Sequence, residues 1–311
     1  MDINSRITIP EVLLSSSSPR MKLLGMGTAT FPRVPSKETK EAILEAIKIG
    51  YRHFDTASLY QTEEPLGQAI AEALSIGLIK SRKELFITSK LWSSDAHSHL
   101  FLTALQKSLW ALQLDYIDLY LIHLPVSCKP GIYEFPVQRE DFLPMDFKGV
   151  WTAMEECQKL GFTKSIGVSN FSCKKLSDIL AIAEIPPAVE INPLWQQKLM
   201  EFCKGNGITL TAYAAVGAGG TIWGSNRVME NEVLNKIAKA KGVTVAQGIC
   251  VLEKSFSERM KQNLNKFNLE LSEEESKKVS QITRNRGCRG EDCISDEGPF
   301  RTIEELWDGK I

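Results

Sequence analysis

The chain has 311 residues, 43% hydrophobic and 24% charged, which is typical of a globular protein with a substantial core. Its 37 Lys and Arg residues balance 38 Asp and Glu residues, so the net charge of −1 lacks the basic surplus that usually accompanies nucleic-acid binding. No apolar run reaches the roughly 18 residues of a membrane span. Residues Met1–Lys22 are polar and rich in serine, without the apolar core of a signal peptide. We therefore expect a cytoplasmic monomer with no nucleic-acid or membrane partner.

The seven cysteines are odd in number and scattered in spacing, which argues against a disulfide framework. We expect free thiols in a reducing compartment. Cys288 and Cys293 are close in sequence, and their pairing under oxidation is the alternative. Because the chain has no Cys-x-x-Cys or paired-histidine spacing, we expect no metal site.

Short apolar runs alternate with amphipathic stretches along the chain. In the first half, the predicted elements are strand Leu23–Met26, helix Lys37–Ile49, strand His53–Asp55, helix Glu64–Ser75, strand Phe86–Lys90, helix Leu100–Leu112 and strand Leu119–His123. The last strand is apolar up to its final residue, which is typical of a strand covered on both faces in a parallel sheet.

The second half begins with a predicted loop, Pro125–Phe147, that contains four prolines. The elements predicted after it are helix Gly149–Leu160, strand Ser165–Val168, helix Cys173–Ala183, strand Val189–Ile191, helix Trp195–Lys204, strand Thr209–Tyr213, helix Asn231–Lys241 and helix Ser272–Ile282. The tail, 284–311, mixes glycine, charge and aromatic residues.

This alternation predicts parallel strands joined by crossover helices. Seven strand–helix units are visible and an eighth is faint, so we predict an α/β protein with one (β/α)8 TIM-barrel domain over residues 1–311. The alternative is an open, doubly wound sheet. Its dinucleotide-binding form needs a G-x-G-x-x-G after the first strand, and none follows it here.

Polar side chains follow successive predicted strands at the end where barrel enzymes place their catalytic groups. Asp55 ends the second strand, Lys90 the third and His123 the fourth, and Tyr60 lies in the loop after Asp55. A single residue of this kind is usually a solvated loop residue or a structural histidine. Four of them on neighbouring strand ends favour a reaction site.

These four groups form a plausible acid. A free tyrosine titrates near 10, too high to be well matched to neutral pH. An ammonium within about 5 Å favours the phenolate, so we expect Lys90 to lower the pKa of Tyr60. Asp55 would hold the ammonium, and His123 would orient a carbonyl. The set suits protonation of a carbonyl oxygen while hydride reaches the carbon.

Five motifs are distributed along the chain, each occurring once. They are GYRHFDTASLY (Gly50–Tyr60), LFITSKLW (Leu85–Trp92), LDYIDLYLIHLP (Leu114–Pro125), IGVSNF (Ile166–Phe171) and KSF…RM…NL (Lys254–Leu264). As a set they closely resemble the aldo-keto reductases over nearly the whole chain. The segments TEEPLG and LPMDFKGVW are most similar to the plant branch of that family that includes chalcone reductase and codeinone reductase.

The resemblance implies that Asp55, Tyr60, Lys90 and His123 form a catalytic tetrad with Tyr60 as the general acid. It also implies these cofactor-binding residues: Thr28, Asp55, Ser169, Asn170, Tyr213, Val216, Lys254, Ser255, Arg259 and Asn263.

Three groups of these cofactor residues have more specific implied roles. Ser169 and Asn170 match the pair that hydrogen-bonds the nicotinamide amide, and Tyr213 matches the ring that stacks on the nicotinamide. Lys254 and Arg259, with Ser255, match the group that holds the adenosine 2′-phosphate. Since a dianionic phosphate suits Lys and Arg donors, we expect NADPH rather than NADH.

For the substrate, the resemblance implies a pocket lined by Ala29, Trp92, His123, Leu124 and Trp223. Leu124 is smaller than the Trp or His of many relatives, so it either widens the mouth for a bulky substrate or merely packs the rim. The tail, 284–311, is expected to fold over the pocket with Phe300 and Trp307. We therefore expect reduction of a ketone or aldehyde, most plausibly a bulky plant specialised metabolite.

The chain also departs from the pattern of the family. Val189 runs straight into Glu190, where relatives insert Asn-Gln-Val, and the Gln of that insert contacts the nicotinamide in relatives. Ala214 replaces a common Ser. Between Gln247 and Lys254 only six residues remain, which span about 20 Å at most. Because a four-residue strand already needs about 13 Å, we expect a shortened eighth βα unit.

These deletions, near residues 189–190 and 248–253, support a second hypothesis. The chain would then be a catalytically impaired or non-catalytic NADPH-binding paralogue on the same barrel. An unrelated barrel enzyme such as a metal-dependent hydrolase is a third, remote reading, because it needs a ligand cluster and the chain has only four histidines.

Overall fold

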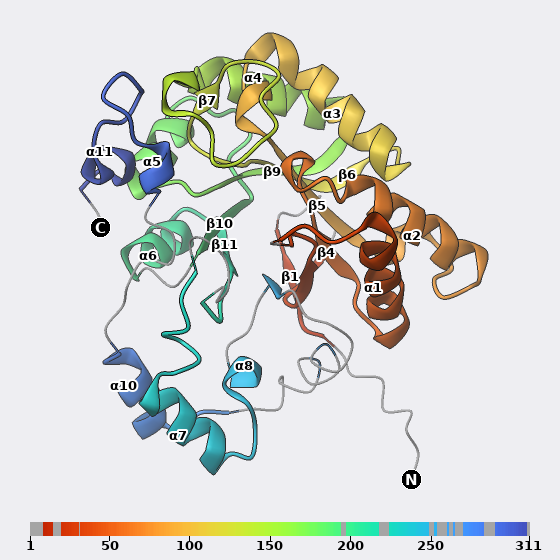
Figure 1. Ribbon diagram of the computed structural model, residues 1–311, viewed down its shortest axis with the longest axis vertical. Helices are drawn as coiled ribbons and strands as arrows, with labels where there is room; N and C mark the ends of the chain where they lie inside the picture. The colour runs from red at the N-terminus through yellow and green to blue at the C-terminus, as the bar shows by residue number, and fades with distance from the viewer. Residues whose placement is uncertain are drawn as a thin grey trace.

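The computed structural model describes residues 9–14, 20–30, 32–193, 197–217, 224–248, 252–253, 260, 264, 270–282 and 290–309. Eight parallel strands close into one barrel (Figure 1). In barrel order they are β3 (Gly25–Gly27), β4 (His53–Asp55), β5 (Phe86–Leu91), β6 (Ile117–Ile122), β9 (Thr163–Ser169), β10 (Val189–Pro193), β11 (Thr209–Tyr213) and β12 (Leu252–Glu253). The predicted (β/α)8 barrel is confirmed, and the open doubly wound sheet is excluded.

Helices follow the strands and cover the outside of the barrel (Figure 1). They are α1 (Ser36–Ile49), α2 (Glu63–Ser75), α3 (Ser98–Leu112), α4 (Phe147–Lys159), α5 (Cys173–Leu180), α6 (Gln197–Gly205), α7 (Glu232–Ala240), α8 (Val245–Gly248), α10 (Glu273–Ser280) and α11 (Ile303–Trp307). The apolar faces of α1 to α6 form the main core against the strands; in α1, for example, Ile43, Ala46 and Ile47 are buried. Gly50 ends α1 in a left-handed conformation with φ 112°, as its stop signal predicts.

Two short hairpins were not predicted. The first pairs β1 (Glu11–Leu13) with β2 (Arg20–Lys22) inside the serine-rich N-terminal stretch. Buried residues beside it, Leu14 and Met21, form a cluster with apolar side chains of the barrel strands, so the hairpin covers one end of the barrel. The second pairs β7 (Ser127–Cys128) with β8 (Phe142–Leu143) inside the stretch predicted as a loop.

The eighth unit is short in both its helix and its strand, as expected. Helix α8 has four residues and β12 has two. Strand β12 makes one register pair with β11, Tyr213 with Leu252, and two with β3. By contrast, β5 and β6 share four pairs. The barrel therefore closes, but with the least pairing at the β11–β12 junction.

In the described ranges no helix is both long enough and apolar enough to cross a membrane.

Candidate active site

The four predicted catalytic side chains meet at the carboxyl ends of β4, β5 and β6. Asp55 is the last residue of β4, Lys90 is next to last in β5, and His123 directly follows β6. Because β4–β5 and β5–β6 are hydrogen-bonded neighbours, these strand ends lie side by side. Tyr60 ends the 3-10 helix η1 (Ser58–Tyr60) in the loop after β4.

The ammonium of Lys90 is the centre of this group. Its Nζ donates hydrogen bonds to Asp55 Oδ1 at 2.5 Å, to the carbonyl of Thr56 at 3.0 Å and to the Tyr60 hydroxyl at 3.4 Å. The Tyr60 hydroxyl lies 3.3 Å from His123 Nε2. Lys90, Asp55 and His123 are buried, whereas Tyr60 is half-buried. The four groups thus form one hydrogen-bonded cluster around the Tyr60 hydroxyl.

The protonation states follow from burial and from the lysine. Burial alone would lower the pKa of Lys90. Asp55 and Tyr60 together raise this pKa by more than burial lowers it, so the pKa lies above its usual value and the amine stays charged. Burial raises the pKa of the Tyr60 phenol by more than Lys90 lowers it. The expected lowering by Lys90 is present, but the expected net direction was wrong, because sequence reasoning did not count the desolvation of the phenol.

His123 is neutral at neutral pH. Burial, and after it the nearby charge of Lys90, holds the pKa of the imidazole well below its usual value. The Trp92 ring meets it edge to face at 5.3 Å between centroids. His123 Nδ1 is buried and has no hydrogen-bond partner among the described residues. A neutral imidazole beside a phenol can donate or accept a hydrogen bond at Nε2, according to its tautomer.

A chain of hydroxyl groups fixes the loop that carries Tyr60. The Thr62 hydroxyl lies 2.7 Å from that of Thr28 and 2.9 Å from that of Thr56, so it joins the two ends of the loop to β3. Thr28 Oγ1 also donates to the carbonyl of Asp55. Ser58 donates to the carbonyl of Lys90. Of the hydroxyl residues in this chain, Thr28 was predicted as part of the site, whereas Thr56, Ser58 and Thr62 were not. Single threonines and serines in a loop carry no distinctive sequence signal.

Two predicted cofactor residues lie at the end of β9, beside the tetrad. The Asn170 side chain donates to the carbonyl of His123 at 3.0 Å and to Ser169 Oγ at 2.9 Å, and it accepts a hydrogen bond from the Tyr213 hydroxyl at 2.8 Å. Asn170 has a left-handed backbone with φ 66°. Ser169 donates to the carbonyl of Ile191. Ser169, Asn170 and Tyr213 therefore form one hydrogen-bonded group, and their binding of a cofactor stays a prediction.

Strand β10 contributes a buried acid that the sequence analysis did not identify as a site feature. Glu190 Oε1 accepts hydrogen bonds from the Phe171 backbone N–H and from the Asn192 side chain, while Oε2 has no partner among the described residues. Burial holds the pKa of this carboxyl well above its usual value, against the lowering effect of these hydrogen bonds. Glu190 thus braces the turn that presents Ser169 and Asn170.

Several predicted residues do not join these contacts. Val216 is half-buried in the turn after β11. The residues predicted to bind the 2′-phosphate and its surroundings, and one pocket residue, lie outside the described residues: Lys254, Ser255, Arg259, Asn263 and Trp223.

Beside the tetrad lies an apolar cluster, which we call the mouth cluster, built from three loops and the tail. Its buried members are Leu59, Trp92, Val126, Cys128, Val137, Phe142, Cys293, Leu306 and Trp307. Half-buried side chains pack against it: Tyr60, Leu124, Ile132, Tyr133, Phe135, Phe300 and Ile303. The 125–143 loop is tied down by Trp92 Nε1, which donates to the carbonyl of Ile132, and by the Tyr133 hydroxyl, which donates to Asp95.

Of the predicted pocket residues, Trp92 and Leu124 belong to the mouth cluster and His123 contacts it through Trp92, whereas Ala29 is exposed at its own strand end. The loop aromatics were missed by sequence reasoning. A long proline-rich loop that carries Tyr133, Phe135 and Phe142 was a usable signal, since loops with large apolar residues need something to pack against.

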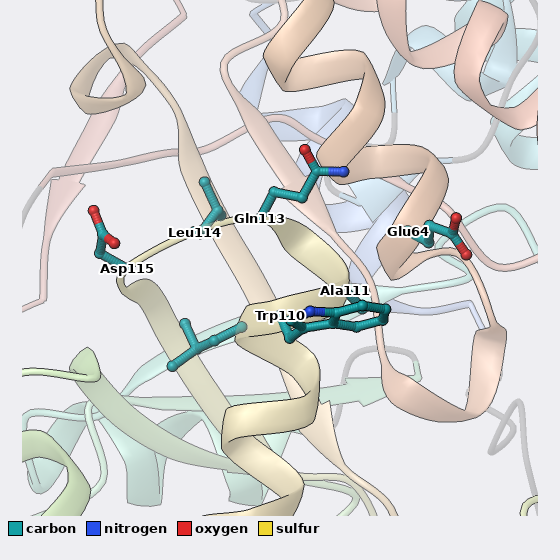
Figure 2. A pocket seen from close by; sticks show the side chains of 7 residues that line it. Glu64, Trp110, Ala111, Gln113, Leu114 and Asp115 are labelled. Carbon is teal, nitrogen blue, oxygen red and sulfur yellow. The ribbon is translucent and has the colours of Figure 1, made fainter.

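A separate hollow lies on the outer wall, at the seam between the first turn of α2 and the last turn of α3 (Figure 2). It is lined by Glu64, Leu109, Trp110, Ala111, Gln113, Leu114 and Asp115. None of the tetrad residues lies there, so it is distinct from the candidate active site. Within the described ranges no group of three or more His, Cys, Asp or Glu side chains is arranged to hold a metal ion.

Comparison with known proteins shows which family the chain belongs to. Residues 23–284 match the model of the aldo/keto reductase family. The chain is 55% identical to the (1S)-1,7-diacetoxy-luvungin A aldo-keto reductase of Citrus sinensis, over 97% of this chain and 99% of that protein. It is 54% identical to NADPH-dependent codeinone reductase 1-4 of Papaver somniferum, over 97% and 98%.

Among solved structures, an aldo-keto reductase of Bombyx mori in complex with NADP superimposes with a TM-score of 0.76 at 31% identity. The superposition covers 88% of this chain and 92% of the Bombyx mori chain. The barrel, the four converging side chains and the family match agree: this chain belongs to the aldo/keto reductase family.

Proposed function

We propose that the chain reduces a ketone or aldehyde to an alcohol with NADPH, and that Tyr60 donates the proton. The observation that carries this proposal is the hydrogen-bonded cluster of Asp55, Lys90, Tyr60 and His123 at the mouth of the barrel. The family, the NADP complex of the Bombyx mori relative and the NADPH dependence in the name of the poppy relative support it.

The described residues fit a nicotinamide nucleotide. Asp55 Oδ2 is buried without a hydrogen-bond partner among the described residues, which suits an acceptor for a ribose hydroxyl. The Asn170 and Ser169 side chains already donate their hydrogens within the protein, but their oxygens can still accept hydrogen bonds from the NH2 group of a carboxamide. Tyr213 offers an aromatic face for a flat ring. Its hydroxyl already bonds Asn170 Oδ1, whose carbonyl-type oxygen can accept a second hydrogen bond.

The proposed mechanism assigns each residue a task. Bound NADPH supplies hydride to the carbonyl carbon. Tyr60 is protonated at neutral pH, since its pKa is raised, and its hydroxyl gives that proton to the carbonyl oxygen. The Lys90 ammonium, held by Asp55, stabilises the phenolate that this transfer leaves behind. Neutral His123 directs the carbonyl oxygen toward Tyr60 through Nε2.

We propose a bulky, largely apolar carbonyl compound of plant specialised metabolism as the substrate. The two plant relatives are named for reactions on compounds of that kind. The mouth cluster presents large aromatic and aliphatic side chains beside Tyr60, and half-buried Leu124 leaves more room there than a Trp would. We propose that the tail, through Phe300, Leu306 and Trp307, forms the roof of this pocket.

The test is Tyr60→Phe, which keeps the ring and removes the acid. We expect kcat to fall by about 10²–10⁴-fold, the range of general acid catalysis, with NADPH affinity within about twofold. Tyr116→Phe is the matched control, because the Tyr116 ring lies against Arg82 and Lys164, away from the tetrad. Unchanged turnover in Tyr60→Phe, measured as carbonyl-dependent loss of NADPH absorbance, would refute the assignment.

One observation favours the second candidate, an impaired NADPH-binding paralogue: β12 has only two residues and one register pair with β11. That candidate predicts quenching of protein fluorescence by NADPH but no carbonyl-dependent oxidation of it. If the chain were too damaged to hold the cofactor, NADPH would also fail to raise the melting temperature.

A further inference from the structure

A buried lysine lies at the start of α5 and outside the tetrad. Lys175 is only 4% exposed, which is unusual for a lysine unless its ammonium is paired. Its Nζ donates to the carbonyl of Leu306 at 2.7 Å and to Asp308 Oδ2 at 3.0 Å. It also lies 4.7 Å from the centroid of the Phe300 ring. All three partners belong to the C-terminal tail.

A second residue of the same helical turn holds the same carboxylate. Ser172, the N-cap of α5, donates its hydroxyl to Asp308 Oδ2 and accepts a hydrogen bond from the Lys175 backbone N–H. Asp308 ends α11 in a left-handed conformation with φ 55°. Figure 1 shows α11 beside α5, although 131 residues separate Lys175 from Leu306. We call Ser172, Lys175 and Asp308 the tail clamp.

The tail clamp joins two parts of the proposed site. On one side, α5 follows directly on the turn that carries Ser169 and Asn170. On the other side, Leu306 and Trp307 immediately precede Asp308 and are buried in the mouth cluster. A shift of Asp308 must therefore disturb two buried side chains of the mouth cluster, against which Tyr60 also packs.

We propose that Lys175 is a positioning residue that locks the tail over the pocket and thereby sets how well bulky carbonyl substrates bind. This inference rests on the proposed function. Lys175 does not reach the tetrad in any described contact; it acts through Phe300, Leu306 and Asp308. Among the described residues, Lys175 is the one cation within salt-bridge distance of Asp308, while the exposed Lys174 acts on it only from farther away, so removal of the Lys175 ammonium leaves a largely buried carboxylate without its direct counter-charge.

The chemistry of the clamp predicts a size-dependent effect. A bulky substrate that touches the roof gains binding energy from Leu306 and Trp307, whereas a small aldehyde that lies against Tyr60 and His123 does not. Release of the tail should therefore raise KM for the bulky substrate and leave kcat for the small one unchanged. A residue that merely stabilised the fold would affect both substrates alike.

The experiment compares Lys175→Met with Lys174→Met in the full-length protein. Met keeps the length and apolar stem of lysine. Lys174 is the matched control, since its exposed ammonium forms its salt bridge with Asp178 on the same helix and acts on Asp308 only beyond salt-bridge distance. The measurements are limited trypsin proteolysis of the tail, NADPH affinity by fluorescence, and kcat and KM for a steroid ketone and for glyceraldehyde. Lys175→Arg tests whether a cation restores the clamp, and Asp308→Asn replaces Lys175→Met if that variant does not fold.

For Lys175→Met we expect faster cleavage between residues 290 and 309, NADPH affinity within about twofold, and a rise of about tenfold or more in KM for the steroid ketone only, which corresponds to about 1.4 kcal/mol. Tail cleavage equal to that of Lys174→Met would overturn the proposal. Equal losses for both substrates would also overturn it. If the wild-type protein reduces no carbonyl, the proposed function fails, but the contrast in proteolysis still decides whether the clamp exists.

Discussion

The two sides of the barrel differ in how firmly they are built. On the catalytic side, every residue of β5 and β6 is buried and the two strands share four register pairs. On the closing side, four of the five residues of β11 are only half-buried, and β11 meets β12 at one pair. The tetrad residues lie on the firm side, and the short eighth unit lies on the other. The tetrad therefore keeps its geometry although β11 and β12 share only one register pair.

The largest expected effect comes from removing the charge at the centre of the catalytic side. Lys90→Met leaves Asp55 without its ion pair and Tyr60 without the ammonium that stabilises its phenolate. We expect kcat to fall by about 10²–10⁴-fold. On the closing side, Tyr213→Phe removes one neutral hydrogen bond to Asn170, so NADPH affinity should fall by less than about tenfold. Steady-state kinetics and cofactor titration give kcat and NADPH affinity for both variants. A loss of kcat in Tyr213→Phe as large as that in Lys90→Met would contradict the difference between the two sides.

Stability should show the same contrast through two Leu→Ala substitutions. Leu121 in β6 is fully buried and packs in the cluster near the N-terminal hairpin, whereas Leu210 in β11 is half-buried. Leu121→Ala should cost about 2–5 kcal/mol of unfolding free energy, because it leaves a cavity that the barrel cannot fill. Leu210→Ala should cost less than half as much. Urea titrations followed by far-UV circular dichroism test the pair, and equal costs would contradict the comparison.

Hydrogen exchange should resolve the two sides without mutation. Amides of β5 and β6 should exchange at least about tenfold more slowly than those of β11, because β11 is less buried and, although it shares five register pairs with β10, it has only one with β12. NADPH should slow exchange more in β11, where Tyr213 lies, than in β6. Mass spectrometry of peptides from the protein with and without NADPH reads both effects. Uniform protection across the barrel would show that the short eighth unit has no dynamic consequence.

Much of this architecture is predictable from the sequence, for a physical reason. Strand and helix patterns alternate along the chain and are separated by turn residues such as Gly50 and Gly207, and β4 and β11 begin and end where predicted. The N-terminal hairpin was missed because three-residue strands in a serine-rich stretch have no detectable period. The tetrad came from strand-end residues together with a family resemblance, and the structure brings those four side chains together.

What could not be predicted depends on contacts distant in sequence. The upward pKa shift of Tyr60 reflects what covers the phenol, and no motif encodes that. The contact of Lys175 with Asp308 joins residues 133 positions apart, so neither residue looked unusual alone. The size of the eighth unit was predictable, because six residues cannot hold a full helix and strand. Closure of the barrel was predicted with the fold, but its register was not, because the two pairs of β12 with β3 and its one pair with β11 depend on contacts distant in sequence.

The smallest expected effect concerns the buried acid behind the cofactor turn. The pKa of Glu190 is raised by burial in the folded chain, while in the unfolded chain it is near 4.3. Its contribution to stability is therefore fully present below about pH 4 and is lost as the pH rises through the folded-state pKa. Gln keeps the hydrogen bond from Phe171 but cannot ionise, so Glu190→Gln should be more stable than wild type at pH 8 and closer to wild type at pH 5. Melting temperatures at both pH values, with exposed Glu201→Gln as control, measure the difference.

A Glu190→Gln variant with the same pH profile as wild type would mean that the carboxyl ionises at little cost and that the turn carrying Ser169 and Asn170 is more open to water than its burial indicates.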